Sequence, residues 1–200
     1  MAGSAHLGIG CRLFFDFNPV KGDFMQKKWL FILLTIALMI SMLFIPFRTA
    51  LVFYDGKTNN QQAFLILDSG DYFGITFTHS IHLTDVVEKY HITDDNKIIQ
   101  YEMIYEEFGI GMPNDAMADE EFEYIDGKYH IKNMTNEFDY LNIRNGKKVS
   151  NHRLSWGNSD ERTDVHTVPF NDYFIPGNWY KLEVKQISLF EQLKGVNIHE

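Results

Sequence analysis

The alternation of apolar and polar residues divides the chain into one long apolar run and many short strand-like segments. Residues 29–47, WLFILLTIALMISMLFIPF, form a run of nineteen positions without a charge. A helix rises about 1.5 Å per residue, so this run spans roughly 28 Å, close to the ~30 Å hydrocarbon core of a bilayer. We therefore predict one N-terminal transmembrane helix over residues 29–47.

Beyond this run, alternating positions rich in β-branched and aromatic residues predict strands. Asp-Gly and Asn-Gly pairs at 126–127 and 145–146 predict tight hairpins. Short helices are expected over 115–122 and 189–195. The predicted strands are 50–55, 63–68, 72–81, 85–92, 97–108, 122–125, 128–132, 138–144, 152–156 and 179–187. Many short strands at regular spacing predict an all-β domain over residues 50–200, an antiparallel β-sandwich or a barrel-like fold.

The charges beside the apolar run predict its orientation in the membrane. Lys27 and Lys28 precede the run, whereas Arg48 alone follows it. The positive-inside rule therefore places residues 1–28 in the cytoplasm and residues 50–200 outside the cell membrane.

An uncleaved anchor and a cleaved signal peptide both begin with such a run. Cleavage after Ala50 would put Arg48 at the −3 position, where signal peptidase sites carry a small residue. We therefore expect an uncleaved anchor. Met25, followed by two lysines and the apolar run, would begin a complete anchor by itself, so residues 1–24 are interpreted as a gene-start artefact.

Charge and cysteine content narrow the expected partners of the exported domain. From residue 51 onward the chain has 13 Lys and Arg and 25 Asp and Glu, so its formal charge is 13 − 25 = −12. Nucleic acid and anionic lipid require the opposite sign and are not expected partners. Cys11 is the only cysteine and precedes the apolar run, so the exported domain has no disulfide and depends on its core for stability.

The stretch FTHSIHLTDVVEKY, residues 77–90, gathers two histidines, a serine and two carboxylates. A hairpin with a four-residue loop over 82–85 would place Ile81 opposite Val86 and Phe77 opposite Tyr90. It would also place His79 opposite Glu88, the only ionisable pair on an otherwise apolar face. This pattern predicts either a satisfied core pair that fixes the register, or a histidine oriented by Glu88 for metal binding or proton transfer.

The neighbouring polar residues do not complete a catalytic site. Ser80 points to the opposite face from His79, so a Ser–His nucleophile is not expected. His82 and Asp85 bracket the loop and fit either turn chemistry or a cation site. FGIGMPN, residues 108–114, contains Gly109, Gly111 and Pro113 but no Walker lysine, which favours a tight turn. No pattern indicates catalytic activity or a cofactor.

Phe77-Thr78-His79-Ser80-Ile81, the downstream Glu88 and the turn 108–113 resemble the bacterial domain-of-unknown-function family eighteen-fifty. Its members carry a THSV-type strand, a later glutamate and a GAGLP-type turn. In the family an acidic residue follows THSV and a proline follows the threonine, whereas His82 and Asp85 occupy those positions here. Such genes often stand beside TAXI-type TRAP solute transporters.

The resemblance therefore implies a membrane-anchored accessory module. Its partner would be the membrane subunit of a TRAP transporter or its solute-binding protein. The alternatives are a metal-binding domain that uses His79 and Glu88, and an envelope structural domain without a ligand. The expected functional surface consists of Thr78, His79, Ser80, His82, Asp85, Glu88, Gly109, Gly111 and Pro113.

Overall fold

The computed structural model describes residues 20–108, 113, 117, 119–157 and 165–199. The chain forms two compact units, residues 1–42 and residues 43–200. The described part of the first unit is helix α1, Val20–Met42, of which Met25–Met42 is long and apolar enough to cross a membrane. This helix is compatible with a single-pass anchor or a signal peptide.

Helix α1 ends earlier than the predicted membrane-spanning helix. The apolar run continues to Phe47, but the last helical residue is Met42. Pro46 has no N–H to donate to the carbonyl of Met42, and its ring disfavours helical backbone at Ile45. The segment 43–47 is therefore apolar but not helical.

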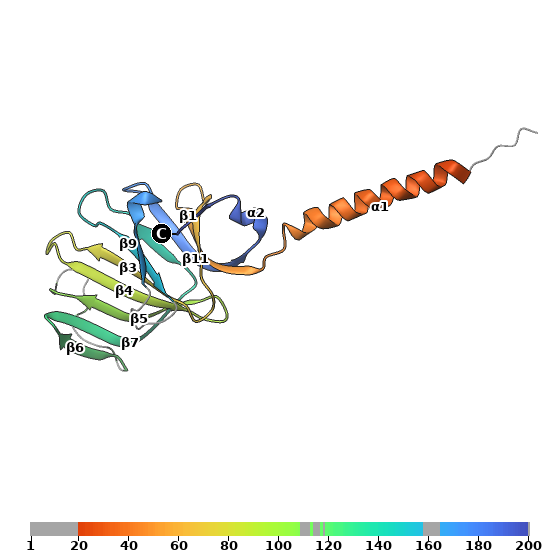
Figure 1. The fold of residues 1–200 in the computed structure, drawn as a ribbon. Helices are drawn as coiled ribbons and strands as arrows, with labels where there is room; N and C mark the ends of the chain where they lie inside the picture. Colours follow the sequence, from red (N-terminus) through yellow and green to blue (C-terminus); the bar gives the residue numbers. More distant parts are fainter. Residues whose placement is uncertain (1–19, 109–112, 114–116, 118, 158–164, 200) are drawn as a thin grey trace, which may run out of the picture. The chain divides into compact units, whose positions relative to one another are not determined.

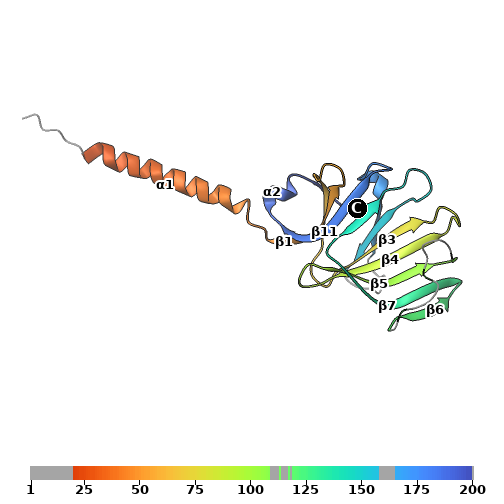
Figure 2. The same cartoon turned by 180° about the vertical axis from the view of Figure 1, so that it is seen from behind.

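The second unit consists mainly of two sheets, which confirms the predicted all-β class (Figure 1; Figure 2). The five-stranded sheet has the order β12 (Val196–Asn197), β2 (Gln61–Ile66), β1 (Arg48–Asp55), β11 (Trp179–Ile187) and β8 (Leu141–Arg144). The seven-stranded sheet has the order β10 (His166–Pro169), β9 (Arg153–Gly157), β3 (Tyr72–Thr78), β4 (Asp85–Ile92), β5 (Ile98–Tyr105), β7 (Lys128–Phe138) and β6 (Glu121–Ile125). The pairs are antiparallel except β12 with β2.

The main core lies between the two sheets. Leu51 and Phe53 of the five-stranded sheet belong to the same buried cluster as Ile75 and Leu154 of the seven-stranded sheet. Each sheet contributes alternate residues, as expected for strands with one face buried. The short 3-10 helix Phe170–Asp172 adds the ring of Phe170, 6.2 Å from that of Phe53. A smaller cluster, which includes Val86, Met103 and Ile131, lies on β4, β5 and β7.

Several predicted boundaries differ from the structure. The predicted strand 72–81 ends at Thr78, and the predicted strand 128–132 continues to Phe138 as β7. Strands β10 and β12 were not predicted. The predicted helix 189–195 is present as α2, Leu189–Gln192. The predicted helix 115–122 lies partly outside the described residues, and its end belongs to β6.

The two expected hairpins have opposite outcomes. Asp126 and Gly127 both have positive φ angles, +50° and +82°, as a two-residue turn between β6 and β7 requires. Asn145 and Gly146 do not form a hairpin, because β8 pairs with β11 and not with the strand that follows it. The buried side chain of Asn145 instead donates to the Phe174 carbonyl (3.0 Å) and so holds a distant loop.

Candidate functional site

The hairpin formed by β3 and β4 has a different register from the predicted one. Ile75 lies opposite Glu88 and Phe77 lies opposite Val86. The predicted pairings of His79 with Glu88 and of Phe77 with Tyr90 are therefore wrong, by four positions. Because side chains alternate with a period of two, this even shift leaves the apolar residues on the predicted face.

The connecting loop explains the shift. The His79 N–H donates to the Thr84 carbonyl (2.8 Å), and the Leu83 N–H donates to the His79 carbonyl (2.9 Å). Leu83 has a φ angle of +60°, a conformation that turns the chain back on itself. Ile81 and Leu83 are 63% and 65% exposed, so the expected contact of Ile81 with Val86 is absent. Backbone hydrogen bonds within the loop take the place of strand pairing there, so the pairing of β3 with β4 ends at Thr78 and Asp85.

Two of the expected site residues meet at the end of this hairpin. The Thr78 hydroxyl donates to Asp85 Oδ1 (2.9 Å), and Arg153 Nη2 donates to Asp85 Oδ2 (2.6 Å). The Thr78 N–H donates to the Ser150 carbonyl (2.8 Å). Arg153 comes from β9, which pairs with the other edge of β3. Asp85 is thus held by one residue of its own hairpin and one from about 70 positions downstream.

His79 and His82 form a second group on the loop. Their rings are stacked with centroids 5.0 Å apart. His82 Nδ1 lies 2.7 Å from Glu107 Oε2, at the end of the chain that leaves β5. Ser80 is exposed between the two histidines. These contacts hold the loop in one conformation while its apolar side chains face solvent.

His152 lies beneath the hairpin in an apolar slot. Its ring is stacked between Phe77 and Phe170, with both centroid distances 5.6 Å. Its Nδ1 atom is buried and has no hydrogen-bond partner among the described residues. Burial, together with the charge of Arg153, lowers the pKa of His152 from about 6.5 to about 4. The imidazole is therefore neutral at physiological pH.

Glu88 is separated from His79 and lies on the inner face of the sheet. Tyr90 donates a hydrogen bond to Glu88 Oε2 (2.9 Å). Burial raises the pKa of Glu88 above its usual range, since that single hydrogen bond only partly offsets the loss of water. The described residues include no group of three His, Cys, Asp or Glu side chains placed to hold a metal ion. The expected His79–Glu88 metal pair thus has no geometric basis.

The glycine-rich turn lies mostly outside the described residues. Gly109 and Gly111 belong to the part that is not described, so their expected role stays a prediction. Pro113 is described, and its carbonyl accepts a hydrogen bond from the Tyr105 hydroxyl (2.5 Å). This bond ties Pro113 to the end of β5.

The outer face of the seven-stranded sheet, which faces away from the main core, carries a charged network. Glu102 is 7% exposed. Its carboxylate lies 2.5 Å from Lys89 Nζ and 2.9 Å from His130 Nδ1. Burial alone would raise the pKa of Glu102, but the hydrogen bonds and charges of His130 and Lys89 outweigh it and lower the pKa. Glu102 is a paired carboxylate, in contrast to Glu88.

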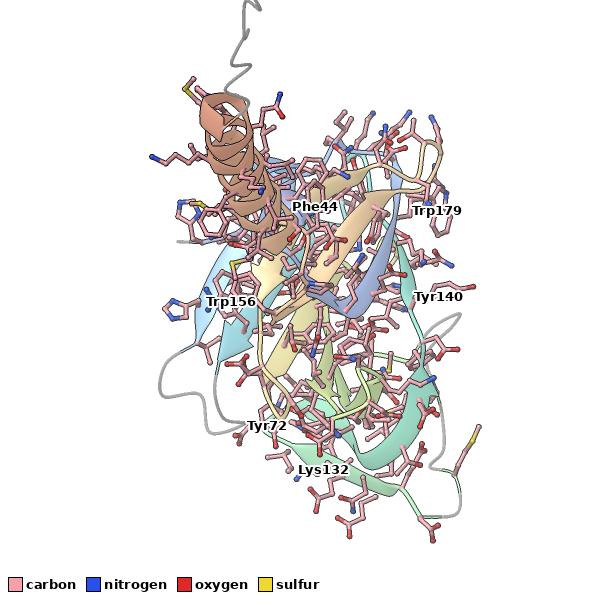
Figure 3. The ribbon with its side chains drawn as sticks, turned by 90° about the vertical axis from the view of Figure 1, so that its right-hand side faces the viewer. Phe44, Tyr72, Lys132, Tyr140, Trp156 and Trp179 are labelled. Atoms are coloured by element: carbon pink, nitrogen blue, oxygen red, sulfur yellow. The ribbon has the colours of Figure 1, made fainter. Side chains whose placement is uncertain are left out.

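An open cavity of about 350 Å³ lies on this outer face. Gly74, Thr76, Val87, Lys89 and Ser155 are among the residues that line it. A β-carbon at position 74 would lie 2.7 Å from Ser155 Oγ, so glycine keeps the two strands in close contact there. Tyr72 and Trp156 at the cavity are labelled in Figure 3.

Residues 73–162 match the family described as Domain of unknown function (DUF1850). This segment belongs to that family. This match confirms the resemblance predicted from the THSI strand, Glu88 and the FGIGMP turn. No curated protein and no solved structure matches the chain.

The DUF1850 segment extends from β3 to the residues after β9 and contains the whole hairpin site. Sequence reasoning missed Arg153 and Glu107, which complete its two polar groups. His152 was not among the residues of the predicted functional surface. The one available signal was the charged Arg153 inside a strand-like segment, since such a residue requires a partner on a neighbouring strand.

The buried neutral His152 makes stability depend on pH. Its pKa is lower in the folded protein than in the unfolded chain, so the unfolded chain binds more protons between about pH 6.5 and 4. The stabilising contribution is complete above pH 6.5 and is lost as the pH falls to 4. We expect His152→Phe, which preserves the stacking, to flatten this decline in urea unfolding of the full chain in detergent. The exposed His199→Gln variant is the control, and an equal decline in His152→Phe would contradict the assignment.

Glu88 and Glu102, the two carboxylates on opposite faces of the seven-stranded sheet, predict opposite changes in stability when each is replaced by glutamine. Glu88→Gln removes a disfavoured buried charge, so we expect it to raise the free energy of unfolding at pH 7. This gain should vanish below about pH 4, where Glu88 is protonated in both the folded and the unfolded protein.

Glu102→Gln leaves Lys89 with a weakened partner, and we expect the free energy of unfolding to fall by about 1–3 kcal/mol at pH 7. Urea unfolding measures both, and shifts of the same sign would refute the contrast.

Proposed function

We propose that this protein is a single-pass, membrane-anchored accessory module of a TRAP-type solute transporter, without catalytic activity of its own. The apolar helix Met25–Met42 supplies the anchor. The lysines before it favour a cytoplasmic N-terminus and an extracytoplasmic β domain. Membership of DUF1850 supports the association with a transporter through the neighbourhood of such genes.

The observation that carries the proposal is the ordered presentation of two apolar side chains at the hairpin end. Ile81 and Leu83 are more than half exposed. The loop that carries them is fixed by its own backbone hydrogen bonds and by the His82–Glu107 contact. A rigid apolar centre with a polar rim is the usual form of a protein–protein contact, because little ordering entropy opposes binding.

The polar groups around the loop fit binding rather than chemistry. Asp85 is already engaged by Thr78 and Arg153, and His152 lies in its apolar slot. Ser80 is exposed, and no described contact joins its hydroxyl to His79 or His82, so neither histidine is placed to act as its base. The partner is expected to be the membrane subunit of the transporter or its solute-binding protein.

A pulldown from native membranes tests this proposal. The test variant combines Ile81→Ser with Leu83→Asn, because asparagine tolerates the positive φ angle at position 83. Burying such side chains stabilises a complex by about 1.5–3 kcal/mol each, so we expect the variant to recover transporter subunits at least about tenfold less than the wild type. Ile175→Ser, at a position 65% exposed elsewhere on the domain, is the matched control.

Three outcomes separate the parts of the proposal. Loss of recovery in the loop variant alone supports a contact at the hairpin end. Recovery that is equal in all three proteins would place the contact elsewhere. Absence of transporter subunits from the wild-type sample would overturn the accessory role itself.

A further inference from the structure

The segment that follows α1 is bound to the short helix α2 within the second unit. The Phe190 N–H donates to the Leu43 carbonyl (3.0 Å), and the rings of Phe44 and Phe190 lie 4.7 Å apart. The Phe47 N–H donates to the Ile187 carbonyl (3.2 Å) just before α2. Segments that are 140 or more positions apart in sequence therefore form one surface.

This surface is apolar and exposed. Leu193 at the end of α2 is 83% exposed, and Ile45 is 56% exposed. We call the whole set the linker–α2 surface; its members are Leu43, Phe44, Ile45, Phe47, Leu189, Phe190 and Leu193. Contiguous apolar patches of this kind are uncommon on soluble domains and mark interaction sites.

The local structure of α2 is fixed, so its exposed side chains are not a result of fraying. Ser188 and Glu191 form a capping box, in which Ser188 Oγ accepts from the Glu191 N–H and Glu191 Oε2 accepts from the Ser188 N–H. Lys185 Nζ also lies 2.8 Å from Glu191 Oε1. The polar residues of this helical turn thus hold it against the domain, and its leucines and phenylalanine face outward.

The length of the apolar helix indicates what covers this surface. From Trp29, the first residue after the lysines, to Met42 there are 14 helical residues, or about 21 Å at about 1.5 Å per residue. The hydrocarbon core is ~30 Å thick, so a helix anchored at its lysines ends about 9 Å short of the outer boundary. The next five residues, Leu43–Phe47, are uncharged and must cover that remaining depth.

We infer that the linker–α2 surface inserts into the outer interfacial layer of the same bilayer that the apolar helix spans. This inference rests on the anchored arrangement proposed above. Because Phe190 is hydrogen-bonded to Leu43, α2 lies at the depth of the linker. Apolar burial at the boundary between headgroups and acyl chains then holds the exported domain against the membrane.

The charges near the surface fit this placement. Lys194 Nζ lies 4.5 Å from the centroid of the Phe190 ring, and a long lysine side chain beside a buried ring extends its charge toward the headgroups. Arg48 begins β1 opposite Ile187, at the start of the same surface. The net charge of −12 beyond residue 50 argues against attraction to anionic lipid as the cause. Apolar insertion in a zwitterionic bilayer is therefore the expected mode.

Figure 3 shows Phe44 in the upper part of the view, away from Tyr72 and Lys132 in the lower part. Strand β6 likewise lies far from α2 in both Figure 1 and Figure 2. A fluorophore on β6 therefore reports a part of the domain that the inserted surface does not include. This separation supplies an internal control.

The experiment places single environment-sensitive fluorophores on the full chain, reconstituted in vesicles of zwitterionic phosphatidylcholine. Cys11→Ser removes the natural cysteine, and the label is attached at Leu193→Cys, at Leu34→Cys in the apolar helix or at Tyr124→Cys on β6. Nitroxides on the lipid, near the headgroup or at the acyl-chain end, report depth. Iodide in the water reports exposure.

We expect shallow nitroxides to quench most of the fluorescence at position 193 and deep nitroxides to quench most of it at position 34. Position 124 should respond to iodide alone. If lipid nitroxides quench the label at 34 but not the label at 193, and iodide quenches the label at 193, the inference is overturned while the anchor stands. A label at 193 that neither the lipid nitroxides nor iodide quench would show that another protein surface covers it, and this result would also overturn the inference. Absence of quenching at 34 would remove the anchor itself.

Discussion

The pairing of β3 with both β4 and β9 is the constraint on which the domain depends. It brings residues about 80 positions apart into register, with Gly74 opposite Ser155 and Ile75 opposite Leu154. Ile75 and Leu154 then enter the main core on the inner face. On the outer face the same register places Arg153 beside Asp85 and so completes the hairpin site. Core and site are two faces of one set of strand pairs.

The ionisable groups follow this division between the faces. The outer face contains matched charges, since Glu102 lies between Lys89 and His130. The inner face contains groups whose charged form is disfavoured, because burial raises the pKa of Glu88 and lowers that of His152.

The sequence pattern predicts the strands and the faces of this domain but not its pairing. Alternation places Phe73, Ile75 and Phe77 on one face correctly, because that inference needs only a period of two. The hairpin register failed because a shift of four positions preserves the same alternation, and the six-residue loop is fixed by backbone hydrogen bonds that no pattern reveals. Arg153 reaches Asp85 only through the pairing of β3 with β9. These strands are far apart in the sequence, so no local sequence pattern predicts the contact.

The central claim is therefore the position of β3 between β4 and β9. Nuclear Overhauser contacts between backbone protons of the full chain in micelles test it most directly. The account predicts cross-strand contacts between Ile75 and Glu88 on one side of β3 and between Gly74 and Ser155 on the other. Contacts between His79 and Glu88, or none between β3 and β9, would contradict it and would separate Arg153 from the hairpin site.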